Sequence, residues 1–363
     1  MAFNPTRLEV ARKRRGYTKR RLASLASISD RRITAYERGE ATPPLETLQK
    51  LAKVLRFPLL FFERPDLPEI PEGAATWRSL SRMTASQRDR ALAGGRLALE
   101  FNDWIEARFV LPEPALPDMR HEKDPEVAAS ALRVHWGLAD KPIGNVVRML
   151  EAMGVRVFSL AEDCQEVDAF SFWRDGKPFV FLNTMKSAER SRFDAAHELA
   201  HLVMHRHGRP DRREVEKEAD RFAGAFLMPR SSLLAFAPRG ATLGDLIDAK
   251  RHWRVAVSAL AYRMHEVRLL SEWHYRTLVI AIQQAGYRSS EPEGCAREMS
   301  GVFEKMFRSL RDEEVSKRDL AAELGWPLPE LRALIFQLVL SSVPGHGTKS
   351  PSSEPKPDLK VIG

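Results

Sequence analysis

The chain has 363 residues, 44% of them hydrophobic and 29% charged, with a formal net charge of +8. This composition excludes a wholly disordered or fibrous protein, and the length predicts two or three domains. No apolar run approaches the roughly 18 residues that cross a bilayer, and the N-terminus has no apolar signal-peptide core, so we expect a cytoplasmic protein that does not contact membranes. The two cysteines, Cys164 and Cys295, are far apart and provide neither a disulfide framework nor a cysteine metal site.

The positive charge is concentrated at the N-terminus. Residues 1–60 contain 14 Lys and Arg against 5 Asp and Glu, a net charge of +9, so the remainder has a net charge of −1. Lys and Arg release the counterions condensed on nucleic-acid phosphates. A basic module joined to a nearly neutral body therefore indicates nucleic-acid binding. A basic helical bundle that binds protein is the alternative.

The basic segment predicts several short helices. Gly16 ends the first, Thr18 caps the second, Ser29 or Asp30 caps a third over 31–38, and a fourth begins after two prolines. The second and third helices, joined by a tight turn, form a helix-turn-helix.

Residues 6–60 resemble the Cro/repressor-type (XRE) helix-turn-helix family through YT..RLA, I.YERG and P.LETL.KLAKVL, which occur in register. The resemblance implies that the third helix enters the major groove of double-stranded operator DNA. It places Ser29, Arg31, Arg32 and Thr34 near bases and Lys19 near a phosphate. Dimerisation would suit DNA binding, so a homodimer is possible, although no coiled-coil repeat demands one.

The central part of the chain is predicted to have mixed structure. Residues 63–75 form a proline-rich linker, 84–109 a long helix, and 125–136 and 142–153 two further helices. A strand over 155–160 precedes a hairpin of 170–173 and 178–183, which turns through Asp175 and Gly176.

The next helix, 193–204, contains the motif HExxH. The four-residue spacing directs His197 and His201 to one point on a helix face, with Glu198 beside the first of them. Zinc held by two such histidines lowers the pKa of a water ligand to about 7, and the glutamate takes its proton as general base. The motif therefore predicts a zinc-dependent peptidase.

A catalytic zinc needs a third protein ligand, and two sources compete. His207 stands ten residues after the first histidine, but the pattern that uses such a histidine requires glycine where Met204 stands. In the next helix, 215–229, a helical projection puts Glu216 about 60° from the apolar face and Glu218 about 100° from it. Glu216 is the preferred ligand, Glu218 the reserve, and Asp220 is a candidate partner for a ligating histidine.

Residues 125–270 resemble the ImmA/IrrE metallopeptidases through FSFWRDGKPFVFLN, RSRFDAAHELAHLVMH and VEKEADRFAGAFLMP. The resemblance implies a zincin-like core whose members cleave DNA-binding repressors. It implies His197, His201 and Glu216 as ligands of one zinc ion per chain and Glu198 as general base. Manganese or iron would also accept this donor set. His205 is expected to pack or to form hydrogen bonds. Tyr262, Arg263 and His265 are candidates for stabilising the oxyanion.

The expected fold is multidomain and mainly α. It combines an all-α helix-turn-helix bundle, an α+β zincin-like metallopeptidase domain with a small β-sheet, and a C-terminal helical segment. Residues 240–267 read as a second helix-turn-helix-like unit within the peptidase domain. The predicted divisions are 1–62 (DNA-binding), 63–123 (linker and helical connector), 124–290 (peptidase), 291–340 (C-terminal helices) and 341–363 (disordered tail).

Two functions of different classes fit these patterns. The first is a DNA-binding zinc endopeptidase that cleaves a DNA-bound helix-turn-helix repressor. The second is a non-proteolytic transcription regulator whose metallopeptidase-like body senses a ligand or binds a partner. The first is favoured because all four ligand and base positions are present.

Overall fold

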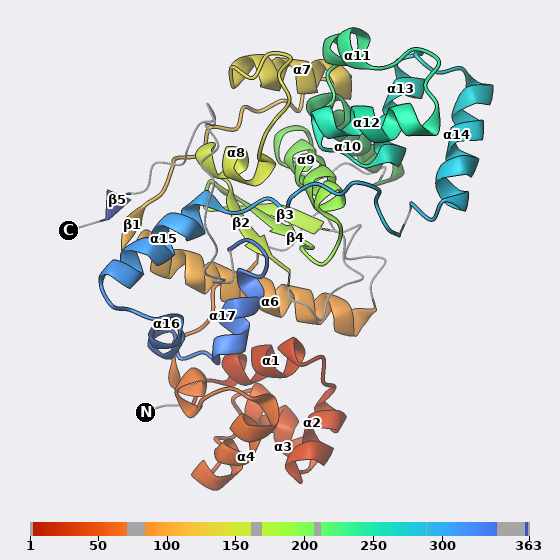
Figure 1. Ribbon diagram of the computed structural model, residues 1–363. Helices are drawn as coiled ribbons and strands as arrows, with labels where there is room; N and C mark the ends of the chain where they lie inside the picture. The colour runs from red at the N-terminus through yellow and green to blue at the C-terminus, as the bar shows by residue number, and fades with distance from the viewer. Residues whose placement is uncertain are drawn as a thin grey trace.

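A computed structural model describes residues 3–70, 84–160, 169–206, 212–287, 289–339 and 360–361. Over these residues the protein is mainly helical, with sixteen α-helices around one small three-stranded sheet, as the sequence predicted (Figure 1). None of the helices in these ranges is long and apolar enough to span a membrane.

The N-terminal bundle has five short helices: α1 (Pro5–Arg14), α2 (Lys19–Ala26), α3 (Asp30–Glu37), α4 (Leu45–Leu55) and the 3-10 helix η1 (Leu59–Glu63). The side chains of Asn4, Thr18 and Ser29 accept hydrogen bonds from the first turns of α1, α2 and α3. Ser27 ends α2 in the left-handed region, with φ 55°, which makes the tight turn into α3. Helix α3 begins at Asp30, one residue before the predicted start, because Ser29 is its cap.

One long helix, α6 (Ala85–Glu106), lies between the bundle and the β-sheet of the rest of the molecule (Figure 1). Helix α1 packs on it, and Arg7 of α1 lies 2.5 Å from Glu100 of α6. Part of the predicted linker, residues 71–75, lies outside the described residues. The short strand β1 (Phe109–Val110) follows α6 and pairs antiparallel with β5 (Lys360–Val361). The rest of the predicted tail, 341–359 and 362–363, also lies outside the description.

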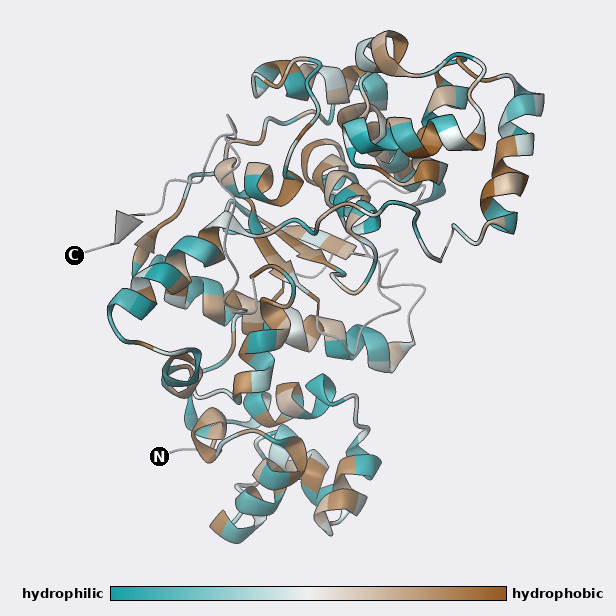
Figure 2. Cartoon of the chain, in the orientation of Figure 1, coloured by the Kyte–Doolittle hydropathy of each residue, from teal (hydrophilic) through white to brown (hydrophobic). Residues whose placement is uncertain are grey.

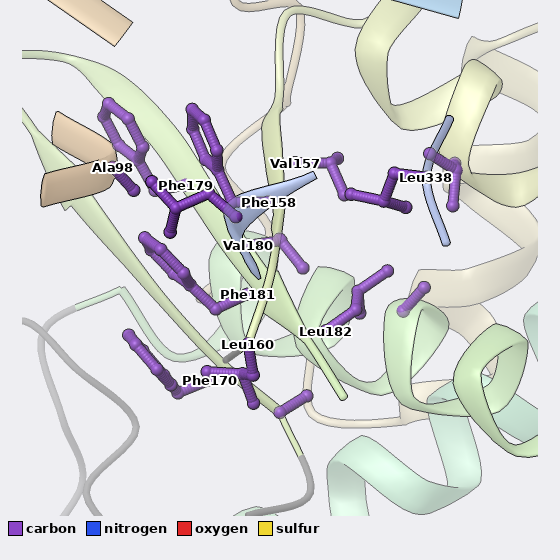
Figure 3. Packing of buried hydrophobic residues seen from close by; sticks show 14 of the residues in the cluster. Ala98, Val157, Phe158, Leu160, Phe170, Phe179, Val180, Phe181, Leu182 and Leu338 are labelled. Carbon is purple, nitrogen blue, oxygen red and sulfur yellow. The ribbon is translucent and has the colours of Figure 1, made fainter. Parts of the chain in front are cut away.

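The three-stranded sheet consists of β2 (Arg156–Ser159), β3 (Ala169–Arg174) and β4 (Lys177–Leu182), in the order β2-β4-β3. The hairpin β3–β4 turns at Asp175 and Gly176, both with positive φ, as predicted. β2 pairs parallel with β4. The strands are coloured hydrophobic along most of their length (Figure 2), and phenylalanine rings stack across them beside Ala98 of α6 (Figure 3).

On the side of the sheet opposite α6, α8 (Val146–Ala152) and α9 (Ala188–Met204) contact the strands, and α7 (Pro125–His135) and α10 (Arg212–Leu227) pack beyond them (Figure 1). Helix α9 contacts β3 and β4, and α10 packs along α9. The prediction that a helix begins at residue 142 was wrong, since α8 starts at Val146. The Asn145 side chain accepts a hydrogen bond from Arg148 N and caps α8 there.

Four further helices extend this layer: α11 (Arg230–Phe236), α12 (Leu243–Trp253), α13 (Val257–Glu266) and α14 (Glu272–Gln284). Arg254, with φ 56°, turns the chain between α12 and α13, so residues 240–267 form the expected pair of helices. The chain then returns past the sheet to the N-terminal bundle through α15 (Gly301–Asp312), α16 (Lys317–Glu323) and α17 (Leu328–Leu334) (Figure 1).

Candidate metal centre and DNA-binding surface

The HExxH motif lies on α9, which is held against the edge strand β3. The indole Nε1 of Trp173 donates to the carbonyl of Leu202 at 3.1 Å, and the Arg206 guanidinium lies 3.6 Å above the Trp173 ring centroid. The strand therefore fixes the C-terminal half of α9, where both histidines are placed.

The structure brings three of the predicted side chains together. The Nε2 atoms of His197 and His201 are 3.1 Å apart, and the Glu216 carboxylate lies 3.5 Å from His197 Nε2 and 3.7 Å from His201 Nε2. One donor atom of each residue lies within 4.8 Å of the other two. Ligand atoms bound tetrahedrally to zinc at about 2.0–2.2 Å stand about 3.3–3.6 Å apart. The donor set and its spacing thus fit a single metal ion.

The outer nitrogens of both histidines support the same assignment. His197 Nδ1 lies 2.9 Å from Asp220 Oδ1, so this nitrogen donates to the carboxylate and Nε2 faces the centre. His201 Nδ1 lies 3.0 Å from His205 Nδ1, and His205 Nε2 lies 2.8 Å from Glu218 Oε2. If His201 Nδ1 donates to His205, then His205 donates in turn to the Glu218 carboxylate. Both histidines are therefore oriented for metal binding through Nε2.

This arrangement separates the two candidate third ligands. Glu216 faces both histidines, whereas Glu218 contacts His205 and is not part of the three-residue cluster. His205 is buried and hydrogen-bonded. The competing candidate, His207, lies outside the described residues.

Glu198 is buried beside the cluster. Its Oε2 accepts a 2.6 Å hydrogen bond from Ser171 Oγ of β3. Burial raises the pKa of the Glu198 carboxyl to about 7, against the opposing influence of His197 and of the Ser171 hydrogen bond. In His197 burial alone would lower the pKa, but hydrogen bonds to Asp220 and Glu216 raise it to about 10. A carboxyl poised near neutrality beside two histidines suits proton transfer.

Ser171 is a residue of the centre that the sequence analysis missed. It stands between Phe170 and Phe172 in a strand whose other buried residues are apolar. Because side chains alternate along a strand, Ser171 faces away from both rings and toward α9. A single polar residue in a buried strand that precedes HExxH was the available signal.

The three candidates for the oxyanion have different environments. The Arg263 guanidinium is 1% exposed and pairs with Glu126 and Glu266, and His265 pairs with Glu272 while its ring stacks on Tyr275. These contacts commit both residues to packing between helices. Tyr262 is 49% exposed and lines a cleft beside Asp220.

The predicted DNA contacts lie on and around α3, which is on the side of the bundle remote from α6 (Figure 1). Arg31 and Arg32 are exposed in its first turn, and Thr34 is half-buried. Ser29 Oγ accepts a hydrogen bond from Arg32 N. Lys19 Nζ lies 3.4 Å from the buried Glu37 carboxylate, so contact with a phosphate would compete with this ion pair.

Comparison with protein families agrees with both parts. Residues 150–265 match a peptidase family model described as the IrrE N-terminal-like domain, and residues 8–62 match a helix-turn-helix model. The first match contains the whole histidine and glutamate cluster, and the second contains α3. No curated protein matches the chain.

Proposed function

Because the chain contains an IrrE N-terminal-like domain and a helix-turn-helix domain, we propose that it is a DNA-binding, zinc-dependent endopeptidase that cleaves a DNA-bound helix-turn-helix repressor. The observation that carries the proposal is the cluster of His197, His201 and Glu216, in which each histidine directs Nε2 to the centre. Histidines that only pack or form hydrogen bonds do not need to direct Nε2 toward one common point.

The residues of the chain divide the chemistry between them. His197, His201 and Glu216 would hold the ion, which supplies Lewis-acid polarisation of a peptide carbonyl and acidifies water. Glu198 takes the proton from the attacking water and returns it to the leaving amine. Asp220 and His205 fix the rings of His197 and His201.

The helix-turn-helix domain would bring the peptidase domain to operator DNA. Helix α3 would enter the major groove, with Arg31 and Arg32 at base edges. Binding beside an operator raises the effective concentration of a repressor bound nearby. A second copy of the chain on a two-fold symmetric site would double the DNA contact.

The first test compares metal content and proteolysis in matched variants. Elemental analysis of protein purified without a metal-affinity tag should find about one zinc per wild-type chain, lost in His197→Ala/His201→Ala. New protein N-termini are then compared by mass spectrometry in cells that express wild-type protein or Glu198→Gln. We expect a new N-terminus within a DNA-binding repressor in wild-type cells alone, because the amide side chain of the variant cannot accept the proton.

The DNA-binding readout distinguishes the two function classes. Glu198→Gln should shift operator DNA in a gel as the wild type does. If it also regulated the promoter normally while no repressor was cut in either strain, the protein would be a non-proteolytic regulator.

A further inference from the structure

A cleft of about 950 Å³ lies beside the candidate metal centre. Its walls are parts of α9, α10 and α13 together with the segment around Tyr287 and Glu291. It connects to the centre through Asp220, which lines the cleft and contacts His197 Nδ1. Pockets that take a specific ligand have volumes of about 300–1,000 Å³, so the cleft is large enough to receive part of a polypeptide.

The cleft follows both helices away from the metal centre. On α9, Phe193 and Arg190 precede His197 by four and seven residues, which places them on the same helix face. On α10, Gly224 and Met228 succeed Asp220 at four-residue intervals. The lining of the cleft therefore extends along one face of each helix from the turns that hold His197 and Asp220.

Apolar and aromatic side chains are exposed in the cleft among polar and charged residues. Phe193 of α9 and Ala259 of α13 are partly exposed in the cleft, and Met185 and Tyr262 line it with exposed fractions of 40% and 49%. Methionine and aromatic side chains adapt to varied apolar groups at little cost.

The charged groups of the cleft are already paired. The acidic lining residues have basic partners: Lys250 Nζ lies 3.4 Å from Glu189 and 3.1 Å from Glu291, and Arg263 lies 2.7 Å from Glu266.

The basic lining residues are paired as well. Arg190 lies 3.0 Å from the buried Asp194 carboxylate, and Lys186 lies 3.7 Å from it. Because these pairs offset one another, apolar contact is the principal source of selectivity that the lining offers.

Helix α13 also favours a peptide ligand over DNA in this second helix-turn-helix-like unit. Its one Lys or Arg, Arg263, is 1% exposed, so the helix presents no lysine or arginine side chain to a phosphate. Ser258, Ala259 and Tyr262 face the cleft instead.

We infer that this cleft receives a large apolar side chain of the substrate polypeptide, of the Leu, Met or Phe class, beside the bond to be cut. Tyr262 and Phe193 are its specificity-determining contacts. The inference rests on the proposed peptidase function for the cleavage itself, but binding in the cleft can be measured without hydrolysis.

The test uses full-length protein and a defined mixture of synthetic peptides, each with one varied residue in a neutral background. Binding is measured with zinc-loaded Glu198→Gln protein, and cleavage with the wild type. Both are repeated in Tyr262→Ala and Tyr262→Phe backgrounds. Trp273→Ala is the matched control, because this α14 side chain is 76% exposed and does not line the cleft.

We expect peptides with Leu, Met or Phe to be enriched by the Glu198→Gln protein and cut next to that residue by the wild type. Tyr262→Ala should weaken their binding about tenfold or more, whereas Tyr262→Phe and Trp273→Ala should retain it. Cleavage by the phenylalanine variant separates the two roles of Tyr262: the variant keeps the ring that contacts the peptide but lacks the hydroxyl that stabilises an oxyanion, so it should cut as the wild type does.

The remaining outcomes distinguish a failure of the cleft assignment from a failure of the peptidase function. Binding without an apolar preference, no peptide binding at all, or equal binding by Tyr262→Ala would overturn the assignment of the cleft. Apolar peptides that depend on Tyr262 for binding but are never cut would support the cleft and count against the peptidase function alone.

Discussion

At the residue scale, the orientation of the proposed metal ligands depends on side chains that do not themselves face the candidate site. His205 is the clearest case, because it is buried between His201 and Glu218 and contacts both. A ring without such a partner can rotate and change tautomer, which weakens it as a ligand. The three side chains therefore act as one chain of hydrogen bonds.

We predict that His205→Ala lowers zinc affinity by about 10- to 100-fold while the fold is retained. Chelator competition on purified protein measures the dissociation constant, and circular dichroism measures the fold. The control is His265→Ala, which removes a histidine that pairs with Glu272 on the surface of α13. Equal zinc affinity in His205→Ala and wild type would contradict the orienting role.

The sequence identified the parts of this centre that share one helix. His197, Glu198 and His201 have a fixed spacing on α9, and the apolar face of α10 pointed to Glu216 because a helix repeats every 3.6 residues. Ser171 and the contact between His205 and Glu218 depend on how β3 and α10 dock on α9. Local periodicity does not contain that information.

At the scale of elements, the sequence predicted which residues form strands better than it predicted which strands pair with each other. Asp175 and Gly176 supply the positive φ angles of a hairpin, so the pairing of β3 with β4 followed from local chemistry. The parallel pairing of β2 with β4 has no turn signal, because the two strands are not consecutive in the chain. Similarly, the sequence predicted C-terminal helices over 291–340 but not that α15 packs against α8.

Helix α15 is attached to α8 through a buried carboxylate. Glu151 Oε2 accepts from Gly301 N at 2.7 Å and from Val302 N at 3.2 Å, and Glu151 also accepts from Ser300 Oγ. Burial raises the pKa of Glu151 from 4.5 to about 7, against hydrogen bonds that lower it. Between these values the folded state binds more protons than the unfolded state, so this group reduces stability as pH rises from about 4.5 through 7.

We predict that Glu151→Gln removes this dependence, because a neutral amide can keep the acceptor oxygen toward Gly301 and donate to Ser300. From pH 5 to 7.5 the free energy of unfolding of the variant should rise relative to wild type by about 2 kcal/mol, which is the part of the effect of the shifted pKa that develops within this pH range. Urea unfolding at several pH values measures it. Glu304→Gln removes an exposed carboxylate from α15 as the control. A difference that stays constant with pH in Glu151→Gln would show that the carboxyl does not titrate in this range.

At the scale of the whole molecule, the DNA-binding bundle is docked on the body. Arg14 and Arg15 of α1 lie 2.7 and 2.5 Å from the Glu330 carboxylate of α17, and both Arg14 and Glu330 are 3% exposed. Trp326 donates to Glu100, which also pairs with Arg7. The sequence predicted a proline-rich linker after the bundle, and contacts between residues more than 300 positions apart hold the bundle to α17. No local sequence pattern reports such contacts.

The ion pairs with Glu330 of α17 lead to a prediction about how the N-terminal bundle moves relative to the rest of the protein. Removing one partner of a buried ion pair costs about 3–5 kcal/mol, because the remaining charge stays desolvated. Glu330→Ala should therefore release the bundle from α17 while leaving the metal centre intact. Spin labels at Lys53→Cys on α4 and Asp312→Cys on α15, with Cys164 and Cys295 replaced by Ser, report the distance between the two parts by pulsed electron resonance.

We expect one narrow distance distribution in the otherwise wild-type protein and a broad one in Glu330→Ala. Glu304→Ala, which removes an exposed partner of Arg148 and Arg308, is the matched control and should leave the distribution narrow. A broad distribution before any change at Glu330 would mean that the bundle moves independently, and DNA binding would then not orient the peptidase. A narrow one means that the operator fixes the direction in which the cleft faces, since α3 lies on the side of the bundle remote from the body.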